Sequence, residues 1–259
     1  SAVRNGTPVL TVKIGQSDLA EEATLSHTGS LTGDDDAWTA ALDQTGLQRV
    51  PDIPDLLARA NAHTAYDTPA SYRVCIASTS GGLASLLADM AAERDLTLPD
   101  IDGETEQALL EMDELLTYGE LHNPADIRGY GADALPEIAD VLLDDDDFDS
   151  YVFAIGLSGV DDRAAEIAAD LQDVAERAEA PVYVLWTGRK DPDDPAETPP
   201  YARLRESVPV YEDPSRCLDA VASTTDFAAD RDRLADQPPR HSLPTTRGGS
   251  CGESPDDDT

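Results

Sequence analysis

The chain has 259 residues, enough for one large or two ordinary domains, and its formal net charge of −35 lies far outside ordinary globular usage. DNA, RNA and anionic membranes are not expected partners, because the sequence holds no basic stripe that could release counterions. It also holds no run of 18 apolar residues and no signal peptide, which predicts a soluble, cytoplasmic protein.

The excess of acid is spread along the chain. Asp and Glu number 53 against 18 Lys and Arg, and Lys13 and Lys190 are the only lysines. A disordered acidic chain should lack regular apolar segments, and an acidic partner-binding surface should concentrate its charge in one block. The even distribution favours adaptation to a cytosol of very high salt, where counterions screen the repulsion.

Short apolar runs without polar alternation predict strands covered on both faces, and helical periodicity appears between them. In chain order, we expect strands at 8–14, 47–50, 72–77, 151–155 and 181–186, and helices at 34–44, 52–62, 83–90, 135–142 and 164–178. Strands alternating with helices of this length predict βαβ crossovers and a parallel sheet.

The periodicity breaks near residues 62–70, which predicts a domain boundary. Residues 67–230 hold enough elements for a complete flavodoxin-like domain, whereas residues 1–66 hold about half of an α/β domain with one unpaired sheet edge. Residues 231–259 are predicted to form a disordered acidic tail. The fold class is therefore α/β, with two flavodoxin-like parallel-sheet units of which the first is truncated at its N-terminus.

No metal site is expected. The three cysteines Cys75, Cys217 and Cys251 are widely spaced and suggest neither a zinc site nor a disulfide framework. The acidic run at 144–147 does not fit an EF-hand loop, and we expect it to be a solvated face.

One histidine lies among small hydroxyl and glycine residues, in the segment Ser-His-Thr-Gly-Ser-Leu-Thr-Gly at 26–33. Glycines allow a ligand to approach closely, and exposed N–H groups and hydroxyls can hold an anion. Neutral imidazole can act as a nucleophile and form a covalent intermediate. The alternative is a polar surface loop with an incidental histidine, and the pattern alone leaves both open.

A second motif, Ser-Thr-Ser-Gly-Gly at 78–82, joins the end of a predicted strand to a predicted helix. Such a junction aims free N–H groups and the positive end of the helix at an anion, and ligands of open parallel sheets gather at this edge. The alternative is an ordinary N-cap with small residues. The motif is neither a P-loop nor a complete dinucleotide fingerprint.

A third motif, His-Asn-Pro-Ala-Asp-Ile at 122–127, is typical of a turn. A structural role is the favoured interpretation for Asn123. Asp126 could cap the next element or touch a ligand.

In this order, the three motifs resemble the NDP-forming acyl-CoA synthetases, the family of ADP-forming acetate–CoA ligase, which is distantly related to succinyl-CoA synthetase. The strand at 8–13 followed by the segment at 26–33 is similar to the family's phosphohistidine segment. The strand at 74–77 with Thr79–Gly82 is similar to the strand and helix start of the ligase domain that follows. Residues 123–127 resemble the family's Asn-Pro-x-Asp turn. The resemblance runs from about residue 6 to residue 230.

The resemblance implies an acid–CoA ligase of the ADP-forming type, which makes acyl-CoA from a carboxylic acid, CoA and ATP through acyl phosphate and phosphohistidine intermediates. It identifies His27 as the catalytic nucleophile. It places the following residues around the phosphate: Ser26, Thr28, Gly29, Ser30, Thr79, Ser80, Gly81 and Gly82. Asn123 and Asp126 are possible substrate or turn residues.

Parts of the family's pattern are missing from these 259 residues: the CoA-binding Rossmann domain, the first half of the domain that carries the histidine, and the ATP-grasp domain. CoA and ATP with magnesium are therefore expected to bind mainly outside this chain. The expected partners are an ATP-grasp subunit or domain and a CoA-binding domain, in an oligomer that the isolated chain needs for activity. A non-catalytic, degenerate binding or regulatory module remains the alternative. A receiver-type domain is disfavoured, because no acidic pocket follows Ile14 or Ala77.

Overall fold

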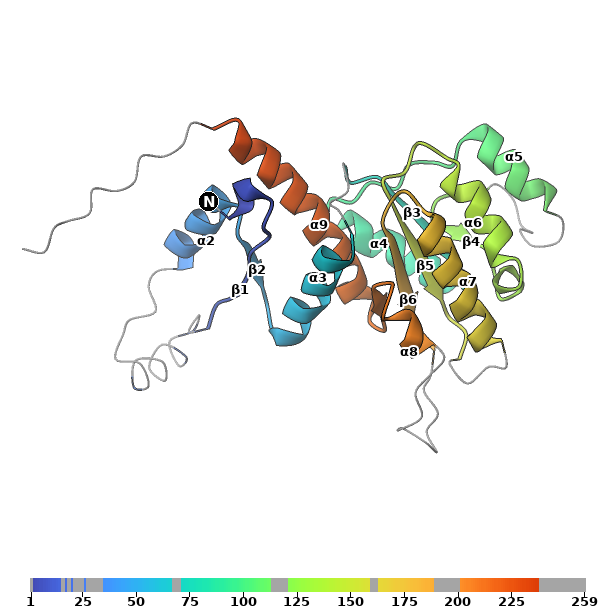
Figure 1. Cartoon of the computed structure of the whole chain (residues 1–259), viewed down its shortest axis with the longest axis horizontal. Helices are drawn as coiled ribbons and strands as arrows, with labels where there is room; N and C mark the ends of the chain where they lie inside the picture. Colours follow the sequence, from blue (N-terminus) through green and yellow to red (C-terminus); the bar gives the residue numbers. More distant parts are fainter. Residues whose placement is uncertain are drawn as a thin grey trace, which may run out of the picture.

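The protein is described by a computed structural model, which covers residues 2–14, 17, 20, 26, 35–66, 71–112, 121–158, 163–188 and 201–237. Within these residues the fold is α/β, with a two-stranded and a five-stranded sheet, and every strand pair is parallel. Figure 1 shows the small sheet on one side of the molecule, the large sheet on the other and the long helix α9 (Pro214–Ala235) running between them.

The small sheet consists of β1 (Leu10–Val12) and β2 (Gln48–Val50). Around it lie the short 3-10 helix η1 (Val3–Asn5) and the helices α2 (Asp35–Thr45) and α3 (Ile53–Ala65). Helix α3 begins where the sequence analysis expects it, because the Asp52 carboxylate accepts the Asp55 N–H at 2.8 Å and caps the first turn.

The large sheet has the strand order β4-β3-β5-β6-β7. Its strands are β3 (Val74–Ser78), β4 (Ala125–Asp126), β5 (Ser150–Ile155), β6 (Val182–Trp186) and β7 (Val210–Tyr211). The connecting elements are α4 (Gly81–Ala92), α5 (Gly103–Glu111), η2 (Tyr130–Ala132), α6 (Leu135–Leu143), α7 (Ala164–Arg177) and α8 (Tyr201–Leu204).

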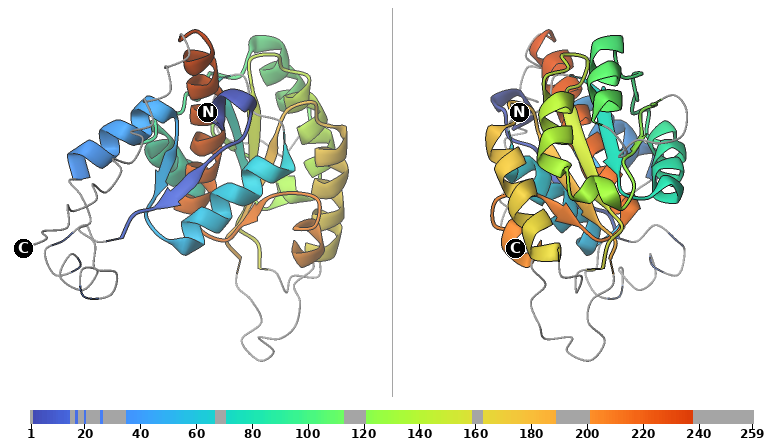
Figure 2. Two further views of the ribbon diagram at one scale, coloured as in Figure 1. Left: turned by 60° about the vertical axis from the view of Figure 1, so that its left-hand side comes forward. Right: turned by 90° about the vertical axis from the view of Figure 1, so that its right-hand side faces the viewer.

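Helices cover both faces of the large sheet, as the continuous apolar strands predict. Cys75, Phe153 and Val184 face a core with α5, α6 and α7, whereas the alternate residues Ile76 and Val152 face α4, α9 and the end of α3. Figure 2 shows these helix layers on either side of the strands. The predicted α/β class with parallel sheets is therefore confirmed.

Helix α9 joins the two sheets. Its first half packs on the large sheet through Leu218 and Val221, and its second half packs Phe227 and Leu234 against Val3 of η1. Because α9 continues to Ala235 and Leu234 is only 4% exposed, the prediction of a disordered tail from residue 231 is wrong for residues 231–235. Residues 238–259 lie outside the described part of the chain.

No helix within the described ranges has the length and apolar character needed to cross a bilayer.

Candidate functional site

The loop between β3 and α4 lies at the carboxyl edge of the large sheet, where ligands of parallel α/β sheets usually bind. Ser80 is the N-cap of α4, with extended backbone angles and an Oγ that accepts the Leu83 N–H at 3.4 Å. The Ser78 Oγ accepts the Ser80 N–H at 3.2 Å and donates to the Ser80 carbonyl at 3.0 Å, which fixes the tight turn. The predicted strand–loop–helix junction is therefore present.

Thr79 ties this loop to the one that follows β5. Its N–H donates to the Ala154 carbonyl at 3.0 Å, and its Oγ1 accepts the Gly156 N–H at 2.8 Å. The Thr79 side chain is buried, and its hydroxyl also lies 3.5 Å from the Ala154 carbonyl oxygen as a donor. Thr79 therefore connects the β3–α4 loop to the residues that follow β5. The role of Gly156 was not predicted, because a single glycine after a strand is a weak signal.

Two glycines open helix α4. A Cβ on Gly82 would meet nothing within 4 Å, so this position is open. A Cβ on Gly81 would collide with the Asp126 Oδ2 and would lie 3.2 Å from the Asp126 Cγ. In the described part of the chain, the N–H groups of Gly81 and Gly82 have no hydrogen-bond acceptor. The structure thus brings Gly81, Gly82 and Asp126 together at the positive end of the helix.

Asp126 reaches this place through strand pairing. Ser78 at the end of β3 is in register with Asp126 at the end of β4, so the two residues lie side by side. The Asp126 Oδ1 accepts the Arg128 N–H at 3.1 Å in a turn where Arg128 has a φ of 57°. The carboxylate is thus held by its own turn on one side and touches α4 on the other.

Asn123, by contrast, is used inside the protein. Its Oδ1 accepts the Ile76 N–H at 2.9 Å, and its Nδ2 donates to the carbonyls of Val74 at 2.7 Å and Pro99 at 3.0 Å. Because β4 pairs with β3 only at Ala77 and Ser78, the amide takes the place of a neighbouring strand along the rest of β3. These contacts favour the structural role.

The histidine segment is described only in part. His27, Thr28, Gly29 and Ser30 lie outside the described residues, and Ser26 is exposed. Residues on either side of this segment form ion pairs with one another. The Lys13 ammonium after β1 lies 2.8 Å from the Asp35 Oδ1 at the start of α2, and Arg49 pairs with the other oxygen of that carboxylate at 3.0 Å.

These ion pairs join the end of β1 to the start of α2. Lys13 is 8% exposed and lies 6.0 Å from the ring centre of Trp38. Hydrogen bonds from Arg49 and Lys13 lower the pKa of Asp35, so the carboxylate stays charged and paired at neutral pH. Lys13 and Asp35, which flank the segment that carries His27 in sequence, are therefore paired at the carboxyl end of β1.

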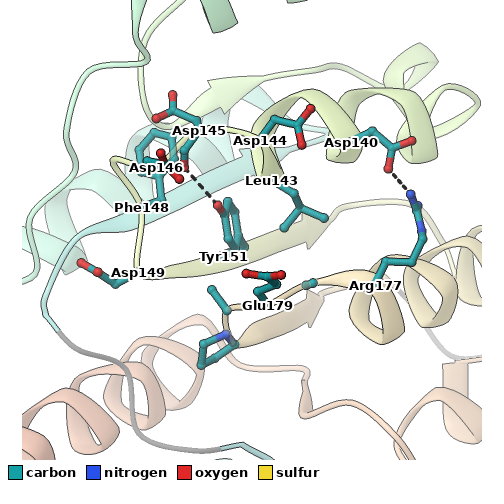
Figure 3. Close-up of a pocket in the computed structure, with 13 residues that line it drawn as sticks. Asp140, Leu143, Asp144, Asp145, Asp146, Phe148, Asp149, Tyr151, Arg177 and Glu179 are labelled. Atoms are coloured by element: carbon teal, nitrogen blue, oxygen red, sulfur yellow. Dashed lines mark hydrogen bonds and ion pairs between the residues drawn. The ribbon is translucent and has the colours of Figure 1, made fainter.

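A pocket of about 880 Å³ opens at the other edge of the large sheet, near the amino ends of β5 and β6 (Figure 3). Acidic side chains line it, among them Asp144, Asp146 and Glu179, together with the ring pair of Phe148 and Tyr151. The prediction that residues 144–147 form a solvated face is wrong for Asp145, which is 4% exposed and accepts the Asp147 N–H at 2.9 Å. Among the described residues, no three His, Cys, Asp or Glu side chains are placed to hold a metal ion.

Parts of the chain are similar to known proteins. Residues 1–63 match the family model for the succinyl-CoA ligase like flavodoxin domain. The chain is 31% identical over 122 residues to the alpha subunit of ADP-forming acetate–CoA ligase I of Pyrococcus furiosus, covering 47% of this chain and 26% of that protein. It is 24% identical over 229 residues to ADP-forming acetate–CoA ligase II of Archaeoglobus fulgidus, covering 86% of this chain and 33% of that protein.

Among solved structures, the chain resembles the apo form of the dinucleotide-forming acetyl-coenzyme A synthetase 1 of Candidatus Korarchaeum cryptofilum. The TM-score is 0.75 at 18% identity, over 90% of this chain and 50% of that one, which establishes a shared fold. The chain thus spans 26% of the first of these ligases, 33% of the second and 50% of the solved structure. The chain is thus similar to ADP-forming acetate–CoA ligases over part of their length, and its first 63 residues match a succinyl-CoA ligase like flavodoxin domain.

Proposed function

We propose that this chain forms part of an ADP-forming acid–CoA ligase, in which His27 relays a phosphoryl group between nucleotide and acyl substrate. The observation that supports this most is the match of residues 1–63 to the succinyl-CoA ligase like flavodoxin domain, since this stretch includes His27. Two structural features also support it. Lys13 and Asp35, which flank the histidine segment in sequence, form an ion pair, and the start of α4 is open at Gly82.

The proposed reaction has three transfers. An imidazole nitrogen of His27 attacks the γ-phosphorus of ATP, and ADP leaves. The phosphoryl group then passes to a carboxylate oxygen of the acid, which gives an acyl phosphate and returns neutral imidazole. The CoA thiol attacks the acyl carbonyl, inorganic phosphate leaves and the thioester remains.

The start of α4 has an electrostatic role in this scheme. The free N–H groups of Gly81 and Gly82 and the positive helix end stabilise the charge of a phosphoryl group on His27 without reorganising. Ser80 caps the helix and Thr79 holds the preceding loop, so both residues position the backbone at the start of α4. CoA and ATP with magnesium bind mainly to an ATP-grasp part and a CoA-binding domain outside these residues.

The experiment supplies those parts as a complementing subunit, with γ-labelled ATP and magnesium in high salt. Label on the chain should be lost in acid and kept in base, as expected for phosphohistidine and unlike phosphoserine at Ser26 or Ser30. His27→Ala should abolish the label and acyl-CoA formation together. His122→Ala is the control, because His122 is an exposed histidine outside the segment 26–33, and it should leave both unchanged.

A second candidate is a non-catalytic binding or regulatory module that keeps the fold without turnover. The placement of Asp126 favours it, since a carboxylate already lies where a phosphoryl group should bind. Wild-type rates of acyl-CoA formation in the complemented His27→Ala protein would reject the relay and make this module the better interpretation.

A further inference from the structure

The outer edge of strand β1 is open in the described part of the chain. Among these residues β1 pairs with β2 alone, and the small sheet ends there. All three residues of β1 are half-buried, whereas β3, β5 and β6 of the large sheet are fully buried. Two strands make a marginal sheet, and parallel strands are normally covered on both faces. The described residues therefore hold only part of this sheet.

The register shows which backbone groups point to the open edge. The Gln48 N–H donates to the Val9 carbonyl at 2.9 Å, and Leu10 is in register with Gln48. Backbone groups of successive residues point to opposite edges of a strand, so those of Thr11 face β2. The N–H and C=O groups of Leu10 and Val12 therefore face outward, where a further strand could pair.

The side chains of β1 differ from those of an ordinary edge strand. Free sheet edges are usually protected by charged side chains. β2 and β4 carry Arg49 and Asp126, but β1 consists of Leu10, Thr11 and Val12 and carries no charge, in a chain with a net charge of −35. This composition is typical of a strand inside a sheet.

Exposed apolar side chains lie on the neighbouring segments. Ile14, two residues after the end of β1, is 70% exposed. Helix α3 contacts β1, and its residues Ile53 and Leu57, one turn apart, are 58% and 62% exposed. Apolar side chains exposed around an open sheet edge favour a surface that another polypeptide covers.

We propose that the open edge of β1 pairs in parallel with an apolar strand from the rest of the ligase. The proposal rests on the proposed function for the source of that strand. The chain spans 26% and 33% of the two acetate–CoA ligases compared above, so most of their length lies outside these residues. Every described strand pair is parallel, whereas a second copy of the chain would place its own β1 antiparallel across a two-fold axis.

Amide hydrogen exchange, followed by NMR on the full chain in high salt, tests the pairing. The probe is the alpha subunit of the Pyrococcus furiosus ligase without the stretch that this chain matches. Adding it should slow exchange of the Leu10 and Val12 N–H groups on the order of a hundredfold. The Arg49 N–H, which the same register places on the outer edge of β2, is the internal control and should keep its rate.

Two variants separate the backbone of β1 from its side chains. Val12→Pro removes one outward N–H, a change that an unpaired edge tolerates, and should weaken binding of the probe at least on the order of tenfold. Val12→Ala keeps the N–H and should retain most of the binding. Circular dichroism of the free variants checks that both are folded.

Unchanged exchange at Leu10 and Val12 in the presence of the probe overturns the inference. Slow exchange of both in a free chain that sediments as a dimer also overturns it, because a second copy then covers the edge. Protection of both amides in a complemented complex that forms no acyl-CoA leaves the inference standing and removes the ligase proposal. Acyl-CoA formation by a complex in which both amides stay unprotected does the reverse.

Discussion

At the scale of single residues, the motif at 122–127 divides its work between two side chains. Asn123 is buried, and its side-chain amide hydrogen-bonds the backbone of β3. Asp126 is exposed, and its carboxylate contacts the start of α4. Two side chains of one turn thus hold the edge of β3 in place and present a negative charge to the start of α4.

Asn123→Ala should destabilise the protein by about 2–4 kcal/mol, because it leaves the Ile76 N–H and the Val74 carbonyl buried without their partner. Urea unfolding followed by circular dichroism measures this. Asn61→Ala, on the exposed side of α3, should change the free energy of unfolding by less than about 0.5 kcal/mol. Similar values for the two variants would contradict the structural role of Asn123.

The charge of Asp126 should also matter for stability. Its carboxylate lies at the favourable end of α4, so Asp126→Asn should lower the free energy of unfolding by about 0.3–1 kcal/mol. Urea titration measures this, and an unchanged free energy of unfolding would contradict the electrostatic contribution of the carboxylate.

At the scale of elements, α3 and α9 form the joint between the two sheets. The His63 Nε2 on α3 lies 3.0 Å from the Ser223 Oγ on α9, and Ser223 in turn hydrogen-bonds the side chain of Gln48 on β2. The His63 ring packs edge-on against Phe227, with ring centres 5.5 Å apart. One buried polar network thus links the small sheet to the helix that covers the large one.

This joint should weaken in mild acid. Burial, helped by the charge of Arg59, lowers the pKa of His63 to about 4, below its ordinary value of 6.5. The unfolded chain therefore binds the proton first, and stability is full above pH 6.5 and declines as the pH falls toward 4, by at most about 3 kcal/mol. Chemical unfolding at a series of pH values should show this decline, and His63→Gln should flatten it. An unchanged slope in the variant would assign the decline to other groups.

Elements with a clear apolar pattern could be predicted from the sequence, and those without one could not. The runs that form β3, β5 and β6 are continuous and fully buried, so their position was evident. Helix α9 was not predicted, because small and hydroxyl residues such as Ala220, Ser223 and Thr224 interrupt the large apolar residues of its buried face. Strands β4 and β7 have two residues each, too few to show a period.

The candidate site divides in the same way. The phosphate-type loop at 79–82 could be identified, because a strand, small residues and a helix follow one another locally. The contact between Asp126 and Gly81 could not, because it depends on the register of two strands far apart in sequence. His27 was identified by resemblance, and its placement against α4 stays a prediction.

At the scale of the whole molecule, the main feature is the excess of negative charge. Arginines pair with acids at many places, among them Arg73 with Asp149 at 2.9 Å and Arg94 with Asp219 at 2.8 Å. With 18 basic against 53 acidic residues, these pairs leave most of the acidic charge uncompensated. The free energy of folding should therefore depend on counterions from the solvent.

Dilution from several molar KCl to 50 mM should unfold the chain, because the screening length grows from about 3 Å at 1 M to beyond 10 Å. Circular dichroism during the dilution measures this, and a matched series in which sodium sulfate holds the ionic strength should retain the fold. Cooperative structure that persists unchanged at 50 mM would remove the high-salt interpretation.

We propose that His27 carries a phosphoryl group in an acid–CoA ligase. The most direct measurement is the acid-labile, base-stable label from γ-labelled ATP in the complemented complex, compared between wild type, His27→Ala and His122→Ala. We expect a label and acyl-CoA formation in wild type and His122→Ala, and neither in His27→Ala. Acyl-CoA formation at the wild-type rate by His27→Ala would contradict it.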